Sequence, residues 1–118
     1  MPRSVHMYVP MYYVAHVRSS GYTPMHGAGF QGRPEIASKL ISFGLEAGDV
    51  HKDGFTPLHR ACWGREERHA ETVRVLVEEG GLSVDVKSGA GTTCDDVTSN
   101  PHTKLVIKKL RKKYSGDL

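Results

Sequence analysis

Three groups of residues in this sequence could carry chemistry: a glycine-rich run, two cysteines and a set of histidines. The run Gly27-Ala28-Gly29-Phe30-Gln31-Gly32 has the spacing G-x-G-x-x-G of loops that cradle dinucleotide phosphates. Such a site needs a strand before the glycines and an acidic residue about 20 residues beyond them. Here Thr23-Pro24 precedes the glycines, and this pair is typical of a helix start. We therefore interpret the spacing as accidental and expect no nucleotide and no other cofactor.

The cysteines and histidines do not fit a catalytic or metal site. Cys62 and Cys94 are the only cysteines. Two cysteines make no disulfide framework and favour a reducing, intracellular setting, the cytoplasm or the nucleus, so we expect both to be buried packing residues. A zinc site needs about four converging ligands, and no paired C-x-x-C or H-x-x-x-H is present. The protein is predicted not to be an enzyme; an enzyme using Cys62 and His59 would require a reactive thiol at Cys62.

A repeat sets the positions of these residues. The string "GYTPMHGAGFQG" begins at Gly21, and "GFTPLHRACWGR" begins 33 residues later at Gly54. A weaker copy, "GTTCDDVTSN", begins at Gly91, 37 residues after the second. Each copy is followed by an apolar-periodic segment: "PEIASKLISFG", "AETVRVLVEEGG" and "HTKLVIKKLRKK". Two short helices per copy are therefore predicted, and because such a pair cannot bury its apolar faces alone, the copies should stack.

Local signals set the predicted ends of the helices. Thr23 and Thr56 should cap the first helices, and Pro24 and Pro57 should follow at the first helical position. Glycine should end the second helices, at Gly44 and Gly80. The second copy has about three extra residues around "REERH", which should extend its first helix or lengthen the turn between its helices.

The spacing and the strings "TPMHGAG" and "TPLHRAC" resemble the ankyrin repeat and its T-P-L-H-x-A signature. The resemblance covers roughly residues 21–113. It implies an all-α solenoid of stacked helix-turn-helix units with hairpin-like loops, in which the signature residues order those loops. In this chain the signature residues are Thr23, His26, Thr56 and His59.

On this basis the repeat domain spans residues 21–114, divided as 21–53, 54–90 and 91–114, with a tail at 115–118. The third copy should be a capping repeat, with Val106, Leu110 and Tyr114 pointing inward. Residues 1–20 match a repeat poorly. They could cap the first unit, be a remnant of further repeats, or form a disordered arm, and an uncovered apolar face there would favour self-association.

The resemblance also implies a function. Ankyrin-type stacks bind other proteins through the hairpin tips and the concave face of the first helices, so we expect a non-catalytic protein-protein interaction module. Arginines around Trp63 would suit an acidic or aromatic partner, whose identity the sequence does not reveal. The candidate contact residues are Phe30, Gln31, His51, Lys52, Phe55, Arg60, Trp63 and Arg65.

The basic C-terminal segment offers an alternative. Its cations could bind nucleic acid or another anionic surface, or they could be the solvated face of the capping helix. No apolar run is long enough to predict a membrane span. The cations are Lys104, Lys108, Lys109, Arg111, Lys112 and Lys113.

Overall fold

A computed structural model describes residues 21–115 of the chain, and within this range every regular element is a helix. The helices form three successive pairs: α2 (Pro24–Gln31) with α3 (Pro34–Ser42), α4 (Pro57–Cys62) with α5 (Glu67–Glu78), and α6 (Cys94–Val97) with α7 (Pro101–Ser115). The expectations for residues 1–20 lie outside the described residues.

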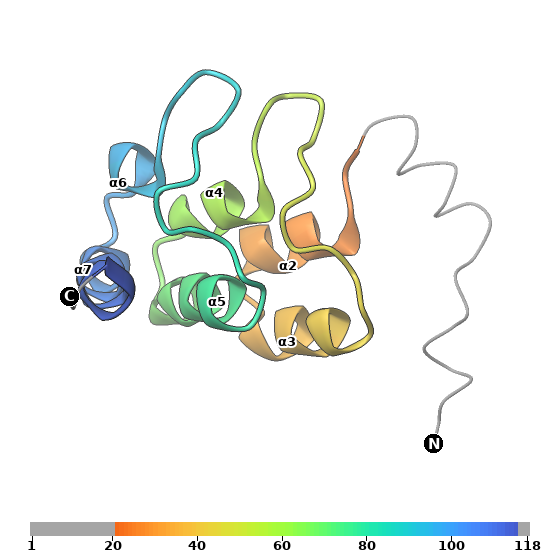
Figure 1. The fold of residues 1–118 in the computed structure, drawn as a ribbon, viewed down its shortest axis with the longest axis horizontal. Helices are drawn as coiled ribbons and strands as arrows, with labels where there is room; N and C mark the ends of the chain where they lie inside the picture. The colour runs from red at the N-terminus through yellow and green to blue at the C-terminus, as the bar shows by residue number, and fades with distance from the viewer. Residues whose placement is uncertain (1–20, 116–118) are drawn as a thin grey trace.

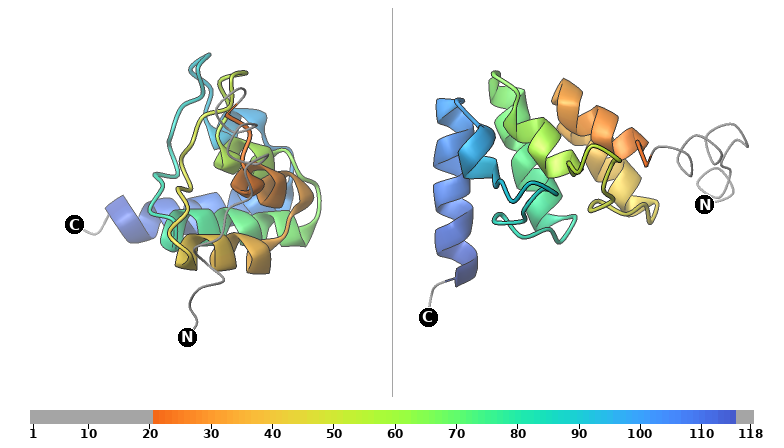
Figure 2. Two further views of the ribbon diagram at one scale, coloured as in Figure 1. Left: turned by 90° about the vertical axis from the view of Figure 1, so that its right-hand side faces the viewer. Right: turned by 90° about the horizontal axis from the view of Figure 1, so that it is seen from above.

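The pairs stack side by side in two layers (Figure 1). Helices α2, α4 and α6 form one layer, and α3, α5 and α7 form the other. The loops that lead into α4 and α6 project from the side of the first layer, and Figure 2 shows them extending in the same direction. The predicted class, an all-α stack of helix pairs with hairpin-like loops, is confirmed.

The predicted helix starts are also confirmed. Thr23 and Thr56 are N-caps whose hydroxyl oxygens accept the backbone N–H of His26 and His59, and Pro24 and Pro57 occupy the first turns. Each cap satisfies one of the donors that the start of a helix leaves without a partner.

The core lies between the two layers, where each pair contributes small or branched apolar side chains. Met25, Leu58 and Leu76 are fully buried there. Ala28 and Ala61 lie at equivalent places in α2 and α4 and are also buried, which lets neighbouring first helices approach closely. Because α2 packs on α4, α3 on α5 and α5 on α7, each pair buries apolar surface against its neighbours and depends on them.

Close approach also explains one glycine of the G-x-G-x-x-G run. A Cβ atom on Gly29 would lie 2.5 Å from the carbonyl oxygen of Pro57 in the neighbouring helix, whereas one on Gly27 would meet only the Tyr22 hydroxyl, at 3.7 Å. Gly32 ends α2 in a left-handed conformation. The run is therefore a helix and its C-cap, and Gly29 is needed for packing.

The extra residues of the second copy lengthen the turn between its helices, which is one of the two outcomes expected from the sequence. The turn covers residues 63–66, against 32–33 in the first pair, and α4 is not extended, with 6 residues against 8 in α2. Helix α5 has 12 residues against 9 in α3. Two details differ from the sequence prediction. After α5 the left-handed residue is Gly81, not Gly80. On α7 the buried face carries Thr103, Ile107 and Leu110, whereas Tyr114 is 59% exposed, so the prediction that Tyr114 points inward is wrong.

Candidate functional site

Two histidines each join a first helix to the loop of the next pair: His26 of α2 and His59 of α4. His26 Nδ1 accepts the backbone N–H of Thr23 at 3.2 Å, so the proton must be on Nε2, which donates to the Phe55 carbonyl at 3.2 Å. Burial lowers the pKa of His26, and this favours the neutral ring that these bonds require. His59 makes similar bonds: Nδ1 accepts from the Thr56 hydroxyl, and Nε2 donates to the Thr92 carbonyl, both at 2.9 Å.

A third histidine, His69, was not singled out from the sequence. It lies in the first turn of α5, where Nδ1 accepts the backbone N–H of Glu66 and Nε2 donates to the Phe30 carbonyl at 3.0 Å. It therefore ties the second pair back to the end of α2. The signal in the sequence was the spacing of three between Glu66 and His69, which repeats the spacing of Thr23 and His26.

Arg60 is the centre of a polar cluster on the first-helix layer. Its guanidinium donates to Asp53 Oδ2 at 2.5 Å and to His51 Nδ1 at 2.8 Å. Desolvation opposes ionisation of Asp53, but the Phe55 N–H, His51 and Arg60 outweigh it and hold the pKa of this carboxyl below its ordinary value. The loop before α4 is therefore held against its own helix by a charged contact.

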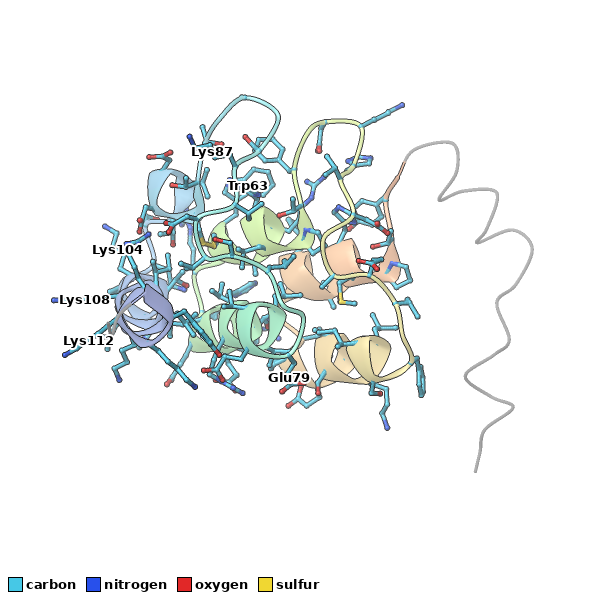
Figure 3. The ribbon with its side chains drawn as sticks, in the orientation of Figure 1. Trp63, Glu79, Lys87, Lys104, Lys108 and Lys112 are labelled. Carbon is cyan, nitrogen blue, oxygen red and sulfur yellow. A yellow bond between two sulfur atoms is a disulfide. The ribbon has the colours of Figure 1, made fainter. Side chains whose placement is uncertain are left out.

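Aromatic rings surround the same guanidinium. The Arg60 Cζ atom lies 5.3 Å from the centre of the Trp63 ring and 5.6 Å from the centre of the Tyr22 ring. Phe55 packs edge-on against Trp63, with 4.8 Å between ring centres. Trp63 remains partly exposed, beside α4 and below the projecting loops (Figure 3). We call Tyr22, Phe55, Arg60 and Trp63, with His51 and Asp53, the inner cluster.

The candidate contact residues thus divide into two sets. His51, Phe55, Arg60 and Trp63 come together in the inner cluster, whereas Phe30, Gln31, Lys52 and Arg65 are exposed outside it. Phe30 is 58% exposed, an unusual place for a large apolar ring. Of the arginines near Trp63, Arg60 pairs with Asp53 and Arg68 with Glu66 at 2.6 Å, which weakens the case for an acidic partner.

The basic segment divides in a similar way. Arg111 bridges Asp85 and Asp95 at 2.5 and 2.6 Å, and Lys113 contacts Glu78 at 3.0 Å, so these cations hold α7 to its neighbours. The contact with Lys113, and that with Arg74, lowers the pKa of Glu78. Lys104, Lys108 and Lys112 are exposed, four residues apart, and form no ion pair within residues 21–115 (Figure 3). We call these three the lysine row; Lys109 is exposed as well.

The prediction that both cysteines are buried is confirmed, but the expectation that they make no disulfide is wrong. Cys62, the last residue of α4, is joined by a disulfide to Cys94, the first residue of α6, with 5.6 Å between Cα atoms. Both residues are completely buried. The expectation failed because the contact joins positions 32 apart in sequence, on different helix pairs.

Asn100 is a second link that the sequence analysis missed. It is 2% exposed and precedes α7, where its Oδ1 accepts the His102 N–H at 2.9 Å. Its Nδ2 donates to the Gly64 and Glu66 carbonyls at 3.1 and 2.9 Å. One side chain thus caps α7 and satisfies the turn between α4 and α5.

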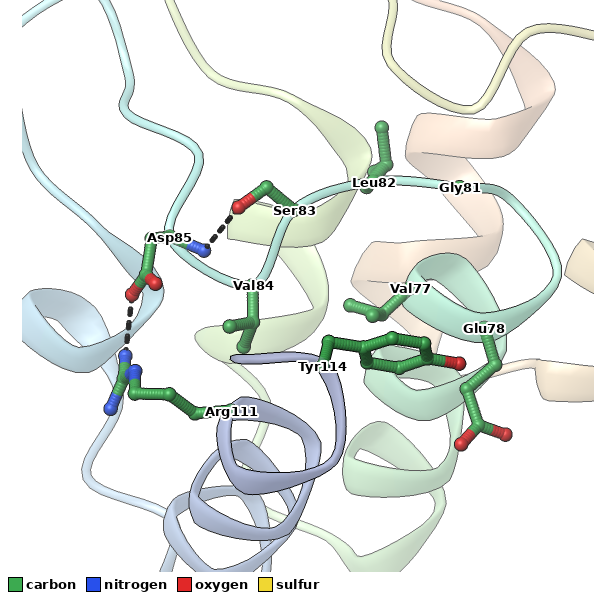
Figure 4. Close-up of a pocket in the computed structure, with 9 residues that line it drawn as sticks. All are labelled: Val77, Glu78, Gly81, Leu82, Ser83, Val84, Asp85, Arg111 and Tyr114. Atoms are coloured by element: carbon green, nitrogen blue, oxygen red, sulfur yellow. Dashed lines mark hydrogen bonds and ion pairs between the residues drawn. The ribbon is translucent and has the colours of Figure 1, made fainter. Parts of the chain in front are cut away.

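Two further features bear on ligands. A shallow pocket lies between α5, the loop after it and α7, with Val77 and Val84 at its base and Tyr114 at one edge (Figure 4). The Arg111–Asp85 contact crosses one side of this pocket. Residues 21–115 contain no cluster of metal-ligating side chains, and no helix among them is long and apolar enough to cross a membrane.

Comparison with known proteins identifies the family to which these helix pairs belong. A model of three ankyrin repeats matches residues 5–88, so the chain belongs to the ankyrin repeat family. It is 35% identical over 85 residues to protein phosphatase 1 regulatory subunit 12A of mouse, and to the same subunit of rat. It is 33% identical over 79 residues to human neurogenic locus notch homolog protein 4.

These matches cover 71% and 67% of this chain but only 8% and 4% of the relatives. The likeness is therefore to the repeats within much longer proteins.

Proposed function

We propose that this chain is a non-catalytic protein-binding module whose contact surface is the inner cluster together with the exposed ring of Phe30. Membership of the ankyrin repeat family supports a protein partner. The observation that carries the proposal is the inner cluster, in which an ion-paired arginine lies between two aromatic rings, one of them the partly exposed Trp63.

The cluster has the composition and order expected of a binding hot spot. Trp, Tyr and Arg dominate such sites because they bury large surfaces and form directed contacts. Here the Asp53 ion pair and the two rings already hold the Arg60 side chain, so a partner does not need to order it. Since Asp53 neutralises Arg60, the surface suits an apolar or aromatic segment of a partner better than a strongly acidic one.

Affinity capture with three variants tests this proposal. Phe30→Ala and Trp63→Ala should each raise the dissociation constant of the captured protein about 30-fold, the effect of losing roughly 2 kcal/mol at a hot spot. Tyr114→Ala is the matched control, because Tyr114 is an equally exposed aromatic residue on the opposite layer, at 59% against 58% for Phe30. It should bind like the wild type.

Loss of binding in all three variants, or in none, would contradict the proposal. Circular dichroism must show that Trp63→Ala remains folded. Phe30→Ala removes only an exposed ring and gives the same test without that concern.

A second function, binding of nucleic acid or another anionic surface, is favoured by one observation, the lysine row. Its three side chains are exposed, whereas Arg111 and Lys113 are engaged with carboxylates. A polar face is also what a terminal helix of a stack requires for solubility. We therefore rank this function second.

A further inference from the structure

The last helix pair is fastened to the stack by the apolar packing of α7 on α5 and by a few specific contacts around α6. Helix α6 has only four residues and offers little apolar surface for packing. Its attachment to α4 includes the Cys62–Cys94 disulfide, and in the loop before it the Thr92 carbonyl accepts a hydrogen bond from His59 Nε2. Beyond α6, Asn100 binds the turn after α4. Around α6, one covalent bond therefore supplements a small number of hydrogen bonds, whereas α7 also packs its buried face on α5.

The two cysteines are placed so that the bond can form and break without rearranging the fold. Their Cα atoms are 5.6 Å apart, within the range that a disulfide spans, and both lie in helices that other contacts hold in place. The thiol forms would fill the same buried space as small apolar side chains.

We propose that Cys62 and Cys94 form a reversible dithiol–disulfide couple that sets how firmly α6 and α7 are fastened to the rest of the stack. In the oxidised form the bond closes a loop between residues 32 apart, which restricts the unfolded and partly opened chain. In the reduced form the pair is held by the packing of α7 on α5, by hydrogen bonds of His59 and Asn100, and by ion pairs of Arg111 and Lys113.

A small-molecule disulfide such as oxidised glutathione is the oxidant. The thiolate of one cysteine attacks the glutathione disulfide, releases one glutathione thiolate and forms a mixed disulfide. The second cysteine, as a thiolate, attacks the protein sulfur of this intermediate and releases the second glutathione. The protein loses two protons and two electrons, and one oxidised glutathione becomes two reduced molecules.

Access of glutathione to the two sulfur atoms controls the rate of thiol–disulfide exchange. Both cysteines are completely buried, so exchange with glutathione must wait until α6 opens locally. A variant that loosens the attachment of α7, such as Asn100→Ser, should therefore speed the thiol–disulfide exchange of Cys62 and Cys94 with glutathione. The steps of the exchange reaction stay the same.

The test uses the full chain in glutathione buffers of graded redox potential. Samples are quenched in acid, unfolded and alkylated, and their masses are measured by mass spectrometry. The number of alkylated cysteines should change from two in reducing buffers to none in oxidising buffers, in a single transition. Hydrogen exchange of α6 and α7 should be at least about tenfold faster in the reduced protein, while α2 and α3 exchange equally in both forms. Asn100→Ser should reach redox equilibrium sooner than the wild type.

The double variant Cys62→Ala, Cys94→Ala is the control, and its exchange should not respond to the buffer. Two results would overturn the proposal: both thiols remain fully alkylated in every oxidising buffer, or the bond forms but the exchange of α6 and α7 does not change. The comparison of oxidised and reduced wild type needs no variant, so a double variant that fails to fold leaves the test intact.

Discussion

Asn100 joins the last helix pair to the turn before α5. Replacing Asn100 should destabilise this end of the molecule more than the end formed by α2 and α3. The Asn100→Ala variant loses the cap on the His102 N–H. It also leaves the Gly64 and Glu66 carbonyls without the amide donor. Because Asn100 is only 2% exposed, water does not readily replace these bonds.

The expected loss follows from the three bonds. A helix cap contributes about 1 kcal/mol, and each hydrogen bond to a carbonyl about 1 kcal/mol net, so Asn100→Ala should lower the free energy of unfolding by about 3 kcal/mol. Asn100→Ser retains an oxygen that can cap α7 but cannot reach both carbonyls, so it should cost about 2 kcal/mol. The prediction is therefore also an order of stability: the free energy of unfolding should be lowest for Asn100→Ala, higher for Asn100→Ser and highest for the wild type.

Urea denaturation of the oxidised protein at 25 °C measures these losses, and hydrogen exchange locates them. Amides of α7 should lose protection before those of α3, because Asn100 holds only one end of the stack. A loss under about 1 kcal/mol for Asn100→Ala would refute the reasoning, as would Ser and Ala variants of equal stability. Either result would mean that the two carbonyls are satisfied in another way.

Three further predictions concern the glycines, a histidine and the lysine row. Gly27→Ala should raise the free energy of unfolding by about 0.5–1 kcal/mol, because its added methyl group makes only an ordinary contact with the Tyr22 hydroxyl and alanine is the better helix former. Gly29→Ala should lower the free energy of unfolding, because its methyl group would press on the Pro57 carbonyl. Urea denaturation that ranks the two variants in the other order contradicts this packing. The pKa of His26 is lowered from 6.5 by burial, so the unfolded chain takes up the proton more readily. The stability due to His26 should therefore be complete above pH 6.5 and decline as the pH falls below it, and the difference in urea midpoint between wild type and His26→Gln should shrink on acidification; a constant difference argues against a neutral ring. Changing the lysine row to glutamate should leave urea stability nearly unchanged, while Lys113→Ala, which removes the contact with Glu78, should weaken the attachment of α7; an equal loss of stability in both would show that the row is structural.

Much of the fold could be predicted because its signals are local. A threonine cap and a proline act within one turn, and the repeated strings place these turns at regular intervals. The histidine bonds to the next loop were also anticipated, since the resemblance supplied them. Helix starts and the stacking of pairs therefore required no knowledge of long-range contacts.

The contacts that join distant residues could not be predicted in the same way. Nothing near Cys62 in the sequence indicates that Cys94 lies beside it, and Asn100 reads as an ordinary cap until the turn after α4 is placed against it. The face of α7 was misjudged because a spacing of four selects several stripes on a helix, and only packing against α5 decides that Ile107, not Tyr114, is buried.

The histidine bonds also give the stack a direction. His26 and His59 each lie three residues after a threonine and donate a hydrogen bond from Nε2 to a backbone carbonyl in the loop of the following pair. In the third pair the same place is taken by Asp96, whose carboxylate accepts the Thr93 N–H at 2.9 Å. An ionised carboxylate has no proton to donate, so it can close its own cap but cannot bind the carbonyl of another loop. A histidine at this position therefore links its own helix pair to the next one, as a propagating unit does in a polymer, whereas Asp96 makes no such link.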